Sequence, residues 1–157
     1  MAGSQHPSSE FAPVFAKLRA ILQQHAEPFS VTDDSPSKYG FASPPGPATI
    51  RAWRGKVRAQ MIPVAFVEVR KSYVSYHLMG LYMNDALARS LSKGLLARKQ
   101  GKSCLNFTND DPALFKELEQ VTARSIEGMK KAGFIQGWQG RKGGRSGKGL
   151  ERENQGC

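Results

Sequence analysis

The stretch KSYVSYHLM, residues 71–79, decides the fold. Its side chains alternate with the period of two that a β-strand imposes. The run IPVAFVEV, residues 62–69, precedes it and is rich in β-branched residues, and a turn near residues 70–72 would join the two as an antiparallel hairpin. The sequence therefore predicts an antiparallel sheet that contains this hairpin.

Outward from the hairpin, helices are predicted near both ends of the chain. Apolar residues recur at intervals of three and four over 11–22, which predicts a helix ending before Pro28. Asp111 followed by Pro112 is typical of a helix start, and Gly133 of its end. The predicted fold class is α+β, an antiparallel sheet with the N- and C-terminal helices packed on one face.

The remaining segments of the body are short. Strands are predicted at 29–32, 39–42 and 104–107, and a turn at 33–37. Asn84 is a candidate cap for a helix that carries three leucines. Residues 48–60 fit either a strand or an irregular connection. The expected organisation is a disordered N-terminus at 1–10, one domain at 11–135, and a flexible basic Gly-rich tail at 136–157.

Charge and cysteine content restrict partners and compartment. Lys plus Arg number 23 against 13 for Asp plus Glu, a net charge of +10 that favours anionic partners. Cys104 and Cys157 are the only cysteines, which is typical of a reducing compartment. No run reaches the roughly 20 apolar residues of a membrane span, and the polar N-terminus is no secretory signal. We expect a cytoplasmic protein without membrane contact.

Four blocks together resemble a known family: VTDD at 31–34, KSYVSYHLM at 71–79, LYMN at 81–84 and GKSCLNF at 101–107. They are similar to the YdhG-like family of bacterial domains of unknown function, and the resemblance covers about residues 11–129. It implies a fold related to frataxin, and one branch of the family is regarded as an intracellular iron chaperone. Gly80 departs from the proline that the family commonly has there.

The iron-chaperone reading needs converging carboxylates, because iron prefers several oxygen ligands. The first predicted helix carries Lys17 and Arg19 instead of an acidic ridge, and the remaining acids are dispersed. No His/Cys spacing fits a zinc site either. We therefore predict no metal site and no cofactor, with iron considered only under this alternative reading.

No catalytic motif is found. The GKS at 101–103 ends like a phosphate-binding P-loop, but Leu96 stands where that motif needs glycine and a strand follows. His77 with Cys104 lacks a third, orienting residue. The sequence predicts a non-enzymatic binding or chaperone-type module.

The first candidate site is a polar surface for a small anionic ligand. If Val74, Tyr76 and Leu78 meet the helices, the alternate residues of the same strand face the other way. Lysines with hydroxyl, amide and imidazole donors suit an anion. The predicted ligand-binding residues are Lys71, Tyr73, Ser75, His77, Lys102, Ser103 and Asn106. The alternative is that Tyr73 and His77 only close the sheet and bond to each other or to backbone.

The second candidate is a nucleic-acid surface. Basic residues surround a tryptophan in the middle of the chain and recur in the Gly-rich tail, a mixture suited to phosphate contact and base stacking. These residues are Arg51, Trp53, Arg54, Lys56, Arg58, Arg141, Lys142 and Arg145. The absence of a recognition-helix motif predicts salt-sensitive binding without sequence preference. The alternative is a solvated basic loop.

Overall fold

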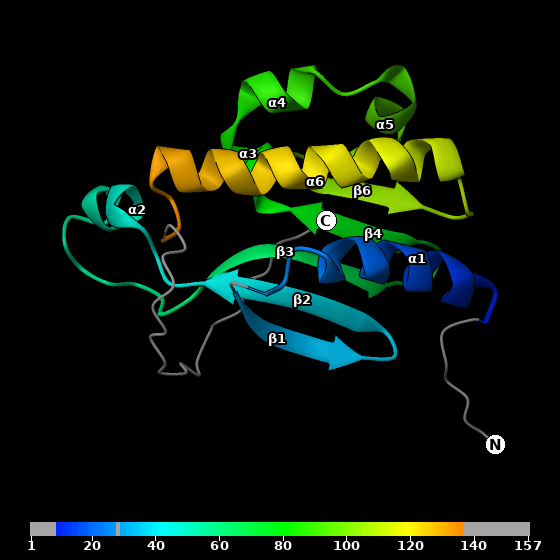
Figure 1. The fold of residues 1–157 in the computed structure, drawn as a ribbon, viewed down its shortest axis with the longest axis horizontal. Coiled ribbons are helices and arrows are strands. Elements are labelled where there is room, and N and C mark those ends of the chain that lie inside the picture. Colours follow the sequence, from blue (N-terminus) through cyan, green and yellow to red (C-terminus); the bar gives the residue numbers. More distant parts are fainter. Residues whose placement is uncertain (1–8, 28, 137–157) are drawn as a thin grey trace.

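In the residues that the computed structural model describes, 9–27 and 29–136, six strands form one antiparallel sheet (Figure 1). The strand order is β1-β2-β3-β4-β6-β5. The strands are β1 (Ser30–Ser35), β2 (Lys38–Ser43), β3 (Ile62–Val69), β4 (Val74–Leu78), β5 (Lys99–Gln100) and β6 (Cys104–Phe107). The predicted β3–β4 hairpin therefore lies in the middle of the sheet.

Two long helices, α1 and α6, lie side by side across one face of the sheet (Figure 1). The helices are η1 (Ser9–Phe11), α1 (Ala12–Gln23), α2 (Pro47–Ala52), α3 (Met79–Met83), α4 (Asp85–Arg89), α5 (Lys93–Arg98) and α6 (Pro112–Ala132). The α2 helix lies at one end of the molecule, and α4 and α5 lie along the β6 side. The α+β prediction is confirmed.

The ends of α6 follow from its sequence. The Asp111 side chain accepts a hydrogen bond from the backbone N–H of Leu114, and Pro112 occupies the first turn, where its missing N–H costs nothing. Gly133 adopts φ 80°, a left-handed conformation that closes the helix.

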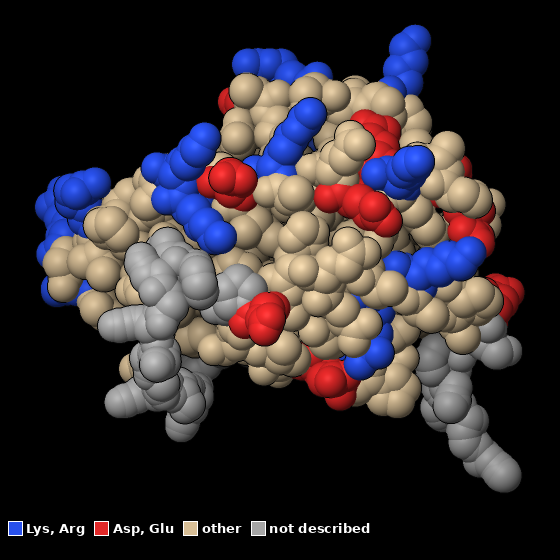
Figure 2. All heavy atoms as spheres, in the orientation of Figure 1, with Lys and Arg blue, Asp and Glu red and all other residues tan. Residues whose placement is uncertain are grey.

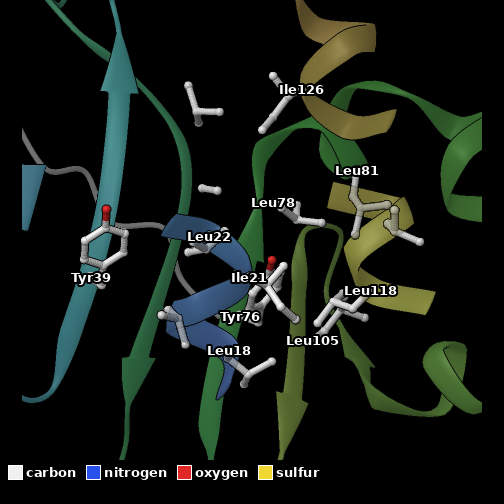
Figure 3. Packing of buried hydrophobic residues seen from close by; sticks show 14 of the residues in the cluster. Leu18, Ile21, Leu22, Tyr39, Tyr76, Leu78, Leu81, Leu105, Leu118 and Ile126 are labelled. Carbon is white, nitrogen blue, oxygen red and sulfur yellow. The ribbon is translucent and has the colours of Figure 1, made fainter. Parts of the chain in front are cut away.

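The core lies between the two long helices and the sheet (Figure 3). Leu18 and Leu22 of α1 and Leu118 of α6 pack there with Tyr76 of β4 and Leu105 of β6, and all five are fully buried. Burying one such side chain contributes about 1.5–3 kcal/mol. This layer fixes β4 and β6 beneath the helices and thereby positions the strands that carry the first candidate site.

Three local predictions are wrong. The turn predicted at 33–37 is shorter, because β1 continues to Ser35 and pairs with β2 through Asp34. Residues 48–60, predicted as a strand or an irregular connection, begin with the short helix α2, and only the part after it is an irregular connection. The helix predicted after Asn84 is divided, since Asn84 caps only α4 and Ser92 caps a separate helix, α5.

The structure covers only part of the predicted terminal segments. Ser9 and Glu10, assigned above to the disordered N-terminus, belong to η1. Residues 1–8 and the tail 137–157 lie outside the described residues, so their predicted disorder stays a prediction. Within the described part of the chain, no helix is both long and apolar enough to cross a membrane.

Candidate anion-binding surfaces

The two faces of β4 have different environments. Val74, Tyr76 and Leu78 face the helices and belong to the core, as expected. The Tyr76 hydroxyl lies 2.7 Å from the Thr122 hydroxyl of α6, and Thr122 in turn donates to the Leu118 carbonyl. Desolvation raises the pKa of Tyr76 far above its ordinary value, so the ring stays neutral in the core.

The opposite face of β4 is also buried at its centre. Ser75 and His77 are each only 2% exposed. In the register with β6, Ser75 lies opposite Asn106 and His77 opposite Cys104. An open polar surface was expected here, and at Ser75 and His77 that expectation is wrong, because neighbouring groups enclose both side chains.

The surroundings of His77 favour its neutral form. Its ring stacks on Phe66 with a centroid distance of 4.5 Å, and its Nδ1 lies 3.3 Å from the Ser103 hydroxyl and 3.5 Å from Cys104 Sγ. Burial, with a smaller effect of Lys38, lowers the pKa of His77 to about 4. At neutral pH the imidazole therefore offers hydrogen-bonding groups but no positive charge for an anion.

The two lysines of the first candidate site lie at opposite ends of β4. Lys71 precedes β4, whereas Lys102 precedes β6, which runs antiparallel to it. Five strand residues span about 16 Å. The structure thus brings His77 beside Ser103 and Ser75 opposite Asn106, whereas Lys71, which precedes β4 together with Tyr73, and Lys102 do not converge on one point. Asn106 donates to the Gln100 side chain at 2.9 Å.

The second candidate surface has more exposed charge. Arg51, Arg54, Lys56 and Arg58, here called the basic segment, are all exposed. No ion pair involves any of the four within the described residues. The sequence explains this, because no acidic residue occurs between Asp34 and Glu68.

The base of this segment is anchored to the end of α6. The Ala48 N–H donates to the Gly133 carbonyl at 2.9 Å, and the Thr49 hydroxyl donates to the Phe134 carbonyl at 2.7 Å. After α2 the chain turns through Arg54 and Gly55, which have φ angles of 57° and 81°. The segment therefore starts from a fixed point, and residues 56–60 then form no helix or strand before β3.

The sequence assigns Trp53 to base stacking, which needs an exposed ring, but the structure does not expose the ring fully. Its side chain is half-buried and packs against the core, whereas the neighbouring Val57 is 59% exposed. The tail residues assigned to this surface, Arg141, Lys142 and Arg145, lie outside the described residues. The described part of the interface is thus mainly cationic, without a freely exposed aromatic ring in the segment itself.

Two features escaped the sequence analysis. A cleft of about 390 Å³ between α1 and the β1–β2 hairpin contains Phe15, Arg19 and Asp34, but Arg19 and Asp34 form an ion pair and leave little net charge in it. Tyr82 of α3 is 54% exposed and carries Lys102 over its ring. The helical position of Tyr82 had no periodic signal, because α3 has only five residues.

Among residues 9–27 and 29–136, no group of three or more His, Cys, Asp or Glu side chains is placed to hold an ion. Five of the dispersed acids form ion pairs with bases. These pairs are Asp33–Lys38, Asp34–Arg19, Glu68–Arg70, Asp110–Lys17 and Asp111–Arg98.

Comparisons with known proteins add no identity. No family model matches the chain, and neither a curated protein nor a solved structure matches it. The resemblance to the YdhG-like family thus stays a prediction that rests on the four sequence blocks.

Proposed function

We propose that this protein is a non-enzymatic module that binds polyanions, above all nucleic acid, without sequence preference through the basic segment. The observation that carries the proposal is a set of four exposed cations for which the described residues supply no acidic partner. A cytoplasmic, bacterial setting in the YdhG-like family is part of the same proposal.

The physical argument is electrostatic. Four like charges within eight residues repel each other, and an anionic strand would relieve this repulsion while releasing its condensed counterions. The anchoring of α2 to the end of α6 would hold the base of the segment in place on binding. The helix has only six residues, too few for a recognition helix, so contacts to phosphate rather than to base edges are expected.

The small-anion and iron-chaperone readings have less support. A small anion needs charges that converge, but His77 is neutral and Lys71 and Lys102 lie about a strand length apart. Iron would need to compete with the ion pairs that already hold the carboxylates, such as Asp110 with Lys17 at 2.6 Å. Both readings stay hypotheses that a ligand titration would test.

The test is a matched pair of double variants. Lys56→Gln/Arg58→Gln removes two charges from the basic segment, and Lys71→Gln/Lys116→Gln removes two exposed charges that also lack a described ion pair elsewhere. The affinity of each protein for a fluorescent single-stranded oligonucleotide is measured by anisotropy over a salt series.

The segment variant should bind more weakly, and the slope of log affinity against log salt should fall by about 1.4, or about 0.7 for each lost contact. The control variant should retain most of the wild-type slope. Equal losses in both variants, or no binding of the wild-type protein at low salt, would refute the proposal.

A further inference from the structure

Tyr82 is the one aromatic side chain among the exposed large hydrophobic residues of the described chain. Its ring is 54% exposed, and the Lys102 ammonium lies 5.6 Å from the ring centroid. An exposed aromatic ring can stack on a base, and a lysine beside it can contact a phosphate. The Tyr82–Lys102 pair is therefore a candidate contact point for nucleic acid.

The surroundings of Tyr82 are basic. Residues 79–103 include five Lys or Arg residues and a single acid, Asp85. Arg89, Lys93 and Lys102 are exposed and form no ion pair within the described residues. Figure 2 shows separate Lys and Arg side chains that project from the edge of the molecule occupied by α4 and α5.

The helix that carries Tyr82 is held firmly from both sides. Gly80 packs so closely on α6 that an added Cβ would lie 2.1 Å from the Ser125 hydroxyl. Leu81 is buried in the core, and Asn84 caps the next helix through the Leu87 N–H. The backbone of Tyr82 is therefore held in place, while its side chain faces solvent. Because the backbone is already ordered, less conformational entropy is lost when a base stacks on the ring.

The Tyr82 region and the basic segment border the same stretch of α6. The α3 helix contacts α6 at Ser125, and α2 is bonded to the chain at Gly133. These two positions are eight residues apart along the chain, a rise of about 12 Å. Lys131 on this stretch and Arg124 immediately before it are exposed, and the stretch lies between α2 and α3 in Figure 1.

We propose that Tyr82, together with Lys102, is a base-stacking site that makes the protein prefer single-stranded over double-stranded nucleic acid. The inference rests on the proposed function and assigns the class of its ligand. Bases in a duplex present their faces to each other, whereas an unpaired base has a free face that an aromatic ring can cover. The basic segment would hold phosphates of the same strand.

Two variants of Tyr82 separate stacking from general surface effects. Tyr82→Leu keeps an apolar side chain but removes the ring, and Tyr82→Phe keeps the ring but removes the hydroxyl. Each is titrated with a single-stranded oligonucleotide, with the same sequence as a duplex, and with an abasic strand of equal length. Thermal unfolding of each variant verifies the fold, and Lys102→Gln tests the cation separately.

Tyr82→Leu should weaken binding to the single strand by about 5- to 100-fold, the range for loss of one stacked base. Tyr82→Phe should stay within about twofold of wild type, and neither change should alter binding to the duplex or the abasic strand. Lys102→Gln should weaken binding to all three probes, since the charge acts on phosphate.

Two other outcomes are distinguishable. If Lys56→Gln/Arg58→Gln weakens binding but Tyr82→Leu binds the single strand like wild type, the stacking inference is wrong and the proposed function stands. If Tyr82→Leu loses equally on the single strand and the duplex, base stacking is also refuted. If the basic-segment variant has no effect while Tyr82→Leu does, the proposed function is assigned to the wrong surface.

Discussion

The helix-facing side of the sheet and the basic segment show two ways in which a sequence determines a region of a protein. On the first, Tyr76 and Leu105 are fully buried, and their neighbours come from distant parts of the chain. In the second, Arg54 and Lys56 are exposed, and the ion pairs of the described residues do not include them. The first region is held by the close packing of apolar side chains, whereas the second is defined by its exposed charges. Mutations in the first should therefore change stability, and mutations in the second should change binding.

The largest effect is expected for Leu118→Asp on α6. The side chain is fully buried in the core, so the variant would place a charge there without a partner or with a strongly shifted pKa. We expect a loss of roughly 3 kcal/mol or more in the free energy of unfolding, or no folding at all. Urea unfolding followed by circular dichroism measures the change.

The matched control is Gln120→Asp, two residues further along the same helix and exposed. It adds the same charge to α6 without burying it and should change stability by no more than about 0.5 kcal/mol. If Leu118→Asp unfolded at nearly the same urea concentration as this control, the helix-facing side of the sheet would not be the core.

Much of the helix-facing side of the sheet was predictable, because elements that pack on one face have a periodic pattern of apolar residues in the sequence. The alternation of residues 71–79 predicted β4, and the start signal Asp111-Pro112 with Gly133 at the end predicted α6. Elements of only a few residues are too short to have such a periodic pattern. The helices α2 and α3, of six and five residues, complete fewer than two turns, so no periodic pattern could reveal them.

The candidate sites were predictable to different degrees. The run of bases without acids is visible in the sequence itself, so the basic segment was found. The half-buried position of Trp53 and the exposure of Tyr82 depend on which residues α2 and α3 contact, information that lies in distant residues such as Ser125. The burial of Ser75 and His77 likewise follows from tertiary packing, since strand alternation alone places them on the outer face.

A second, somewhat smaller effect is expected from pH on the other face of β4. Because burial lowers the pKa of His77 to about 4, the folded state binds its proton less readily than the unfolded chain, whose histidine pKa is about 6.5. This contribution is complete above pH 6.5 and is lost as the pH falls toward 4. The loss of stability from this group should reach about 3 kcal/mol near pH 4.

Denaturant unfolding at several pH values tests this expectation, with His77→Gln as the comparison. The substitution itself will cost stability, so the pH dependence matters and not the absolute value. Stability of the variant should fall less than that of wild type between pH 6.5 and 4, the excess being the His77 contribution. Parallel pH profiles would show that His77 is not held in its neutral form.

The smallest change in stability is expected in the basic segment. Lys56→Gln/Arg58→Gln removes two exposed charges that form no ion pair within the described residues, and it slightly reduces repulsion with Arg54. The free energy of unfolding should therefore stay within about 0.5 kcal/mol of wild type.

The same variant is expected to lose affinity for an oligonucleotide, so both measurements are made on one preparation. If the variant loses affinity while its free energy of unfolding is unchanged, Lys56 and Arg58 contribute to binding and not to stability. A drop of about 2 kcal/mol or more would mean that the segment supports the core and that the two regions are coupled.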